Sequence, residues 1–420
     1  MISILILSIF VIALFVNYKK TFIVLMVLYT WLSQFKVPGI PISLFAVLSS
    51  FAFLLYIVKF GFNRFIVGNL GLLGVSIFLI CGSLILSNHF AVYKHYPSLI
   101  VNIIVLLNLF ILYAILRSAQ QKYVTYFVRV CYIYGGFISL YTLFEAITNT
   151  NPYIEFVNNY DLYSQDFIIT ETRFGIKRCQ SIFSMHCTLG AVALVLGCLL
   201  LYAKQFFKEL LPYKYLSLII FLLFLAVFFT GARSAILGFI ICLVMFLNKK
   251  YIRVRYIIPL IFICVVGTFF LSDYFSSIYE SVVDTEKVGG SNTDMREGQL
   301  AIAEYFMNQS FWVGNGLSYT FEFVQANFKD ELLGAESLWF PIMIDQGAIG
   351  IIVYVFYIVS CCFYVVKMKN YRLLFFVLGV LVFNSMSSIP NFNFIYSMMY
   401  ILVMIVIKDI SRINVYKKLR

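Results

Sequence analysis

Residues 186–203 read HCTLGAVALVLGCLLLYA, a run that contains no lysine, arginine, aspartate or glutamate. As an α-helix, a run of this length extends about 27 Å, close to the roughly 30 Å hydrocarbon core of a bilayer. No water reaches that depth, so a spanning segment must satisfy its own backbone hydrogen bonds, which a helix does. The run therefore predicts a membrane-spanning helix, and many similar runs accompany it.

The composition of the whole chain supports the same conclusion. Of 420 residues, 62% are apolar and 12% are charged, whereas about a quarter of the residues of soluble domains are charged. Single hydrophobic cores stop growing at about 250–300 residues, so a soluble fold has no place for this much apolar surface. The expected fold class is all-α: a polytopic transmembrane helical bundle of about 12–13 helices, with a large outer-face loop that contains short helices.

Apolar segments recur along the chain at lengths typical of membrane helices. They lie near residues 2–16, 21–35, 41–58, 65–86, 100–116, 124–147, 186–203, 215–230, 235–247, 256–271, 347–366, 373–387 and 393–407. The first segment has neither a basic start nor a small-residue cleavage site. We therefore expect a retained helix there rather than a signal peptide.

The net charge of +12 is expected to orient the chain in the membrane rather than to bind nucleic acid. Most lysines and arginines lie in every second loop and in the C-terminal tail, and nearly all acidic residues lie in the other loops. By the positive-inside rule, the basic loops are cytoplasmic. The prediction is a multi-pass membrane protein with its N-terminus outside and its C-terminus in the cytoplasm.

Two outward segments are long, residues 148–185 and 272–346, whereas the inward loops are short. The predicted organisation is N-terminal membrane helices (1–147), membrane helices with a first outer loop and an Arg-Ser turn (148–271), a large outer loop (272–346), and C-terminal membrane helices with a cytoplasmic tail (347–420). Function is therefore expected at the outer face. No P-loop or dinucleotide motif indicates nucleotide chemistry on the inner side.

Two groups of cations lie next to predicted helix ends on the outer side. Arg173, Lys177 and Arg178 fall within six residues of one another, and such a group can bind phosphate or pyrophosphate. The alternative is a basic stretch that contacts lipid headgroups. Arg233 lies in the short break at residues 230–234, where it must reach outward or face a polar cavity. Its small neighbours would let a ligand approach the backbone.

The large outer loop carries a third arginine on a predicted helix. Residues 294–308 are expected to form an amphipathic helix with Arg296 near its start, available to an anion, and with Ala301, Tyr305 and Met307 as its apolar members. A turn with two glycines follows it. The alternative is a solvated helix and loop without function.

Glu336 precedes a run of apolar and aromatic residues, where it could act as a general base. Alternatively, it caps the helix that follows. His186 is expected to begin a helix beside the first basic group. No Asp-X-Asp pair and no cluster of His, Cys and carboxylate residues has the spacing of a divalent-metal site, so we expect metal-free chemistry without a cofactor.

The order of these motifs resembles the O-antigen polymerase (Wzy) and O-antigen ligase superfamily over roughly residues 170–366. The matching features are Arg178, Phe183 and His186 in order, then LAVFFTGARSA at 225–235, the Arg296 helix with Gly314-Asn-Gly316, and Glu336-Ser337 with Gly347 and Gly350. The chain departs from the family pattern at Ser181, where a glycine is common, and at His186-Cys187, where Pro-Asn is common.

The resemblance implies a glycosyltransferase C-type membrane fold in the bacterial inner (plasma) membrane. The substrates would be glycans on undecaprenyl pyrophosphate, transferred with inversion and without a metal. Arg178, Arg233 and Arg296 match arginines that hold the pyrophosphate, next to Arg173 of the first basic group. Glu336 falls where ligases carry a His-Asn pair, and the absence of that pair favours a polymerase over a ligase.

The expected function is therefore an O-antigen or capsule-type polysaccharide polymerase. Its glycan would contact His186, Trp312 and Trp339 as well as the catalytic pair Glu336 and Arg233. The alternatives are an O-antigen ligase, a flippase or transporter for lipid-linked oligosaccharides, and a membrane scaffold. Partners are the lipid-linked glycan and the bilayer, with no nucleic acid; whether a chain-length regulator and a flippase also bind stays open.

Overall fold

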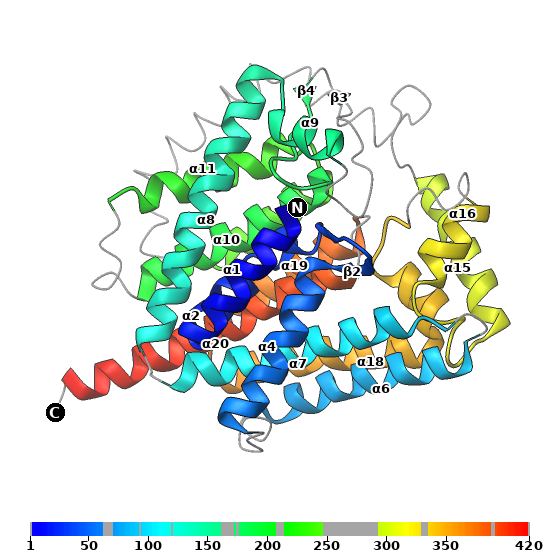
Figure 1. The fold of residues 1–420 in the computed structure, drawn as a ribbon, viewed down its shortest axis with the longest axis horizontal. Helices are drawn as coiled ribbons and strands as arrows, with labels where there is room; N and C mark the ends of the chain where they lie inside the picture. Colours follow the sequence, from blue (N-terminus) through cyan, green and yellow to red (C-terminus); the bar gives the residue numbers. More distant parts are fainter. Residues whose placement is uncertain are drawn as a thin grey trace.

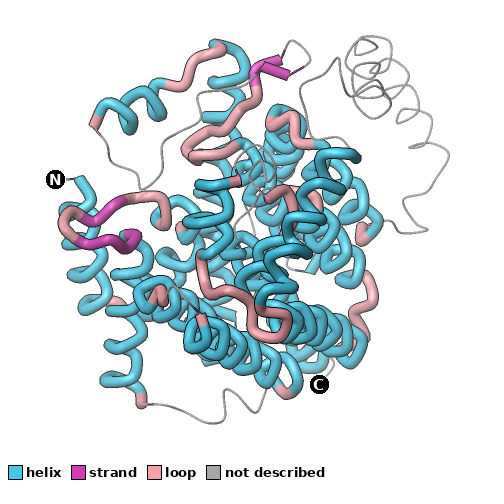
Figure 2. Tube along the Cα trace, turned by 90° about the vertical axis from the view of Figure 1, so that its right-hand side faces the viewer, coloured by secondary structure: helices cyan, strands magenta, loops and turns pink. Residues whose placement is uncertain are grey.

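The computed structural model describes residues 2–61, 70–91, 94–118, 121–160, 172–173, 176–206, 214–246, 293–328, 335–387 and 391–418. Almost all of this chain is helical (Figures 1 and 2). The prediction of an all-α polytopic helical bundle is confirmed. Two short antiparallel hairpins were not predicted: β1 (Lys36–Val37) pairs with β2 (Ile40–Ser43), and β3 (Thr172–Arg173) pairs with β4 (Ile176–Lys177).

The N-terminal third of the chain forms seven of the described helices. They are α1 (Ile2–Val16), α2 (Tyr18–Val27), α3 (Tyr29–Leu32), α4 (Leu44–Phe60), α6 (Leu72–Phe90), α7 (Tyr96–Ser118) and α8 (Gln121–Thr148). The segment predicted at 21–35 is divided into α2 and α3. The start of α4 is capped by Ser43, whose hydroxyl accepts a hydrogen bond from the Ala46 N–H at 3.3 Å.

The rest of the described chain forms further membrane helices and shorter ones between them. They are α9 (Pro152–Asn159), α10 (His186–Phe206), α11 (Leu216–Phe229), α12 (Arg233–Val244), α15 (Thr293–Gln309), the π-helix η1 (Thr320–Val324), α16 (Gln325–Asn327), α18 (Trp339–Lys367), α19 (Leu373–Ser385) and α20 (Asn391–Lys418). The segment predicted at 256–271 lies outside the described residues.

Five of the described helices are long and apolar enough to cross a membrane: α6, α7, α8, α10 and α18. The shorter apolar helices α1, α4, α11, α12 and α19 accompany them. The run quoted first, α10, is the most fully enclosed of the five spans, because it packs against α8, α11, α12 and α20. By contrast, α18 exposes an apolar stripe at helical spacing, consistent with a lipid-facing side: Ile352, Val355, Val359 and Phe363.

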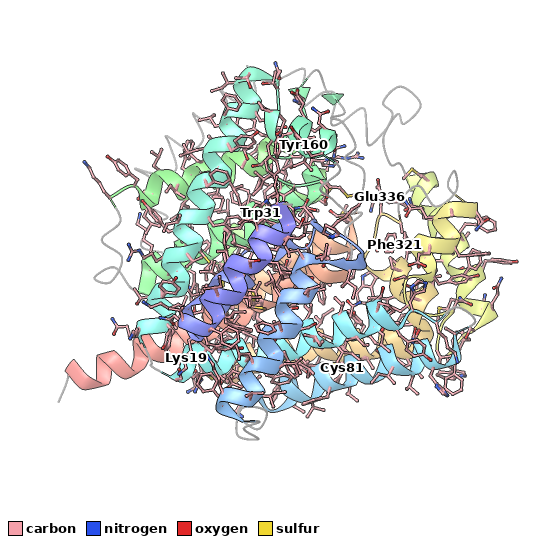
Figure 3. The ribbon with its side chains drawn as sticks, in the orientation of Figure 1. Lys19, Trp31, Cys81, Tyr160, Phe321 and Glu336 are labelled. Atoms are coloured by element: carbon pink, nitrogen blue, oxygen red, sulfur yellow. The ribbon has the colours of Figure 1, made fainter. Side chains whose placement is uncertain are left out.

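Basic residues from distant segments meet at one end of the bundle. The Lys19 ammonium donates a hydrogen bond to the Ser118 hydroxyl at 3.1 Å, and Lys408 donates to the Lys369 carbonyl at 2.7 Å. Arg117 forms an ion pair with Asp409 at the same end. We call this the basic end; Figure 3 shows Lys19 there and Glu336 far from it, on the opposite side of the molecule.

A separate group of short elements lies at the right-hand edge of Figure 1, around α15 and α16. We call residues 293–328 and 335–346 the α15 module. It has a small apolar core of its own, formed by Ala303, Phe306, Val324, Ala335 and Ile344. The module is therefore a folded unit rather than an open loop.

Helix α18 is broken near its start, where the α15 module joins it. Gly347 has φ 62° and ψ −154°, which no α-helix contains. The turn after α15 supplies substitute acceptors: the Phe311 carbonyl accepts from the Ala348 N–H at 2.8 Å, and the Trp312 carbonyl accepts from the Ile349 N–H at 3.1 Å. The break thus connects the membrane helix to the module by backbone hydrogen bonds.

Asp345 strengthens this connection. Its side chain is buried, and one carboxylate oxygen accepts from the Thr320 N–H at 2.8 Å and from the Thr320 hydroxyl at 2.6 Å. The other oxygen accepts from the Ser318 N–H at 3.1 Å. The Ser87 hydroxyl of α6 donates to the Asp345 carbonyl. One residue therefore joins α6, α18 and the chain that leads into η1.

Candidate functional site

Arg178 is buried where the chain leaves β4, with 8% of its surface exposed. Its Nε donates a hydrogen bond to the Thr230 carbonyl at 3.2 Å, and the neighbouring Cys179 N–H donates to the Phe229 carbonyl at 2.9 Å. These carbonyls end α11, where backbone acceptors lack helical partners and the helix dipole attracts a cation. The C-terminus of α11 therefore fixes the Arg178 side chain.

The turn between α11 and α12 is shaped around Arg178. Gly231 has φ 61°, and a Cβ there would lie 3.3 Å from Cγ of Arg178. Two residues later, Arg233 begins α12 and is half-buried. A helix N-terminus already favours anions, so a guanidinium at this position adds to a positive potential.

Arg296 approaches the same region from the first turn of α15. Its Nη2 lies 3.3 Å from the Met386 carbonyl and 3.7 Å from Oε2 of Glu336. Beside Met386, the Ser387 hydroxyl contacts the hydroxyl of Ser234, which is the neighbour of Arg233. This chain of contacts brings the starts of α12 and α15 together.

Glu336 faces the arginines from the segment before α18. Its side chain is 27% exposed, and its backbone N–H donates to the Gln299 side chain at 3.3 Å. The alternative that Glu336 caps α18 is wrong, because the Trp339 N–H at the start of that helix bonds to the Ser337 hydroxyl at 3.2 Å. At 3.7 Å from Arg296, the carboxylate is in electrostatic rather than hydrogen-bonding contact.

The charges of Arg296, Glu336 and Arg178 all act on the guanidinium of Arg233. We call these four residues the arginine cluster. Three cations face one carboxylate, so the cluster has a formal excess of two positive charges. Guanidinium groups match phosphate oxygens in geometry as well as in charge. The cluster can therefore bind a phosphate or pyrophosphate next to a carboxylate that can accept a proton.

The remaining predicted site residues lie in different surroundings. Trp339 is close to the cluster, since its indole N–H donates to the Ser385 hydroxyl at 3.0 Å, directly before Met386. His186 begins α10, and its Nε2 lies 3.1 Å from Sγ of Cys187. Arg173 lies in β3, and its side chain is outside the described part of the structure.

Trp312 does not join the arginine cluster. Arg296 is near the start of α15 and Trp312 follows its end, which separates them by about 20 Å along the helix. Its side chain is 63% exposed, and its backbone is bonded to α18 beyond the break at Gly347. Any contact between Trp312 and a glycan would therefore be remote from the four charged residues.

The apolar face predicted for α15 was partly wrong. Tyr305 is 59% exposed and Ala301 is also exposed. Met307 is buried as predicted, and the buried face also contains Gln299, Ala303 and Phe306, at helical spacing from Arg296. Sequence reasoning missed Gln299, which positions the Glu336 backbone, although its spacing of three residues from Arg296 was a usable signal.

Cysteine chemistry is excluded next to Arg178. Burial, and after it the negative charge of Glu145, raise the pKa of the Cys179 thiol to about 12, against an opposing effect of Lys177. Such a thiol is not a nucleophile at neutral pH. Within the described ranges, no group of three or more His, Cys, Asp or Glu side chains comes together as a metal site would require.

Residues 218–355 match the family model Wzy_C, described as O-antigen ligase. The match agrees with the resemblance to the O-antigen polymerase and ligase superfamily. It contains Arg233, Arg296 and Glu336, whereas Arg178 lies before it. Five described helices are long and apolar enough to cross a membrane, and four of them, α6, α7, α8 and α10, lie entirely outside the matched residues. No curated protein matches the chain.

Proposed function

We propose that this protein is a glycosyltransferase that polymerises lipid-linked oligosaccharide repeat units at the outer face of the bacterial plasma membrane. The observation that carries the proposal is the arginine cluster: three guanidinium groups and one carboxylate, from segments far apart in the sequence, meet at the end of the bundle opposite the basic end. In the proposed topology the basic end is cytoplasmic, with the C-terminus, and the N-terminus is outside.

The proposed reaction uses each member of the cluster. The pyrophosphate of the undecaprenyl-linked chain binds Arg178 and Arg233, with Arg296 beside them, and a hydroxyl of the incoming repeat unit lies near Glu336. The hydroxyl oxygen bonds to the anomeric carbon as the bond from that carbon to the pyrophosphate breaks. Glu336 takes the hydroxyl proton, and undecaprenyl pyrophosphate leaves. Preorganised cations that face the developing charge supply the main catalytic effect.

An Arg233→Ala variant is expected to stop chain growth. In a deletion strain, wild type should restore a ladder of polymer lengths, whereas Arg233→Ala should leave a single repeat unit on the lipid core, as seen by gel electrophoresis of the glycans. The matched control is Arg129→Ala, at an exposed position within α8, which should give the wild-type ladder. Membrane expression is checked for each variant.

The same strain separates the polymerase from its rivals. Full-length polymer retained on its lipid carrier in the deletion strain would identify a ligase, the second candidate and the activity named in the description of the matching family. Single units that face the cytoplasm would identify a flippase, and Arg129→Ala should then impair function. A wild-type ladder from Arg233→Ala would contradict the proposed role of the cluster.

Glu336→Gln tests the proton acceptor separately. General-base catalysis contributes about 10²–10⁴-fold to rate, so we expect kcat to fall at least about 100-fold while the donor KM stays within about threefold. The assay is polymerisation by purified protein with lipid-linked repeat units. Glu304→Gln, at an exposed position of α15, is the control and should retain the wild-type kcat. An unchanged kcat for Glu336→Gln would assign the proton to another acceptor.

A further inference from the structure

Two acidic side chains are buried among the described residues, Asp345 and Glu145. Asp345 joins α18 to the α15 module, but Glu145 has no part in the reaction proposed above. It lies near the end of α8, with 0% of its surface exposed. A buried carboxylate is costly unless hydrogen bonds compensate for its lost hydration. Its partners therefore indicate what it does.

One oxygen of Glu145 holds the segment that carries Arg178. Oε2 accepts from the Ser181 N–H at 2.7 Å and from the Gln180 N–H at 3.1 Å. The carbonyl of Ser181 is held as well, because it accepts a hydrogen bond from the Asn151 side-chain amide at 2.8 Å. The backbone of residues 180–181 is thus fixed from both sides.

The backbone at Ser181 needs this support. Ser181 has φ 54°, in the left-handed region that residues other than glycine seldom adopt. Bonds to the carboxylate on one side and to Asn151 on the other hold it there. Three residues earlier, Arg178 is fixed by the end of α11. The short segment 178–181 is therefore tied to α8 at one end and to α11 at the other.

We infer that Glu145 is a positioning residue: by fixing the backbone of residues 180–181, it sets the Arg178 guanidinium for the pyrophosphate. The inference rests on the proposed function of Arg178. Glu145 itself binds no substrate and transfers no proton. Its effect on catalysis passes through Arg178, so the two residues should be strongly coupled.

Limited trypsin digestion tests the positioning without any assay of activity. Trypsin cleaves after lysine and arginine, and in wild type the buried Arg178 should be protected in protein reconstituted in nanodiscs. Glu145→Leu removes the acceptor, so we expect cleavage after Arg178, located by mass spectrometry, to accelerate at least about tenfold. Glu145→Gln retains an oxygen that can accept hydrogen bonds from both N–H groups. Its rate of cleavage after Arg178 should therefore be within about threefold of the wild-type rate. Glu155→Leu, at an exposed position of α9, is the control.

Kinetics then test whether the positioning acts through Arg178. Glu145→Leu and Arg178→Ala should change the same parameter, the donor kcat/KM, and the double variant should be within about threefold of Arg178→Ala alone. Glu145→Gln should rescue most of the loss. Losses that multiply in the double variant would show a general structural role and overturn the inference, because residues that act through one another are not additive.

The two hypotheses fail in distinguishable ways. If Arg178→Ala lowers kcat/KM but Glu145→Leu alters neither cleavage nor kcat/KM, the inference fails and the proposed function stands. If Glu145→Leu exposes the segment but Arg178→Ala has wild-type kinetics, the proposed function of Arg178 fails. Should Glu145→Leu not fold, Glu145→Asp, which keeps the charge but shortens the reach, replaces it. Wild-type cleavage in that variant would also overturn the inference.

Discussion

Replacing Gly347 by alanine is expected to destabilise the protein by about 4 kcal/mol, because positive-φ strain and overpacking each cost about 1–3 kcal/mol. A Cβ on Gly347 would lie 2.5 Å from the Phe311 carbonyl oxygen and 2.7 Å from the Gly314 nitrogen. Both are backbone atoms that cannot rotate away. Gly314→Ala should behave alike, since its Cβ would lie 2.4 Å from the Asp345 carbonyl carbon and oxygen.

The measurement is thermal unfolding of the purified protein in detergent, together with its level in membranes. Gly298→Ala is the matched control, because a Cβ at that position in α15 meets no heavy atom within 4 Å. Alanine favours helix over glycine by about 0.5–1 kcal/mol, so this variant should equal or exceed wild type in stability. If Gly347→Ala were as stable as Gly298→Ala, α18 would have to be continuous.

Arg178→Ala is expected to lower kcat/KM for the lipid-linked donor about 10²–10³-fold, the usual effect of removing one preorganised group that stabilises developing charge. Arg178→Lys should recover little, because an ammonium cannot keep the Nε bond to Thr230 and also present a planar fork to a pyrophosphate. Initial rates at varied donor concentration measure both effects.

Lys177→Ala separates this role from simple contact with lipid headgroups. Lys177 precedes Arg178 directly, and its ammonium donates to the Asn149 carbonyl at 2.8 Å. If the basic stretch only contacted headgroups, the two variants should be impaired equally. Arg178, at 8% exposure, is enclosed by protein, so its role differs from that of a lysine that contacts headgroups. We therefore expect the kcat/KM of Lys177→Ala to stay within about threefold of the wild-type value. Equal losses would favour the headgroup interpretation.

Much of the fold could be predicted because a spanning helix must be apolar over its whole length. The run at 186–203 identified α10, and the charges of the loops identified which of them gather at the basic end. Arg178, Arg233, Arg296 and Glu336 were selected from the order of their motifs, and the structure brings them together. The sequence offered no distances among them.

The hydrogen-bond partners of the buried carboxylates could not be predicted. Glu145 and Ser181 lie on different segments, and only the tertiary fold brings them together. The break at Gly347 depends on carbonyls from the distant turn after α15. The face of α15 was partly misassigned because Tyr305, although aromatic, is on the exposed side. Aromatic side chains at membrane boundaries have an apolar body and a polar tip, so their presence does not identify a core face.

The buried carboxylates of Glu145 and Asp345 differ in when they are synthesised relative to their hydrogen-bond donors. Glu145 precedes Gln180 and Ser181 in the chain, so its carboxylate is made before the N–H donors that bond to it. At about 5–20 residues per second, they emerge a few seconds later. Asp345 follows Ser318 and Thr320 in the chain, so its donors are made before its carboxylate. Translation order therefore leaves the Glu145 carboxylate without these two donors until residues 180–181 are made, whereas the donors of Asp345 are present before α18 is synthesised.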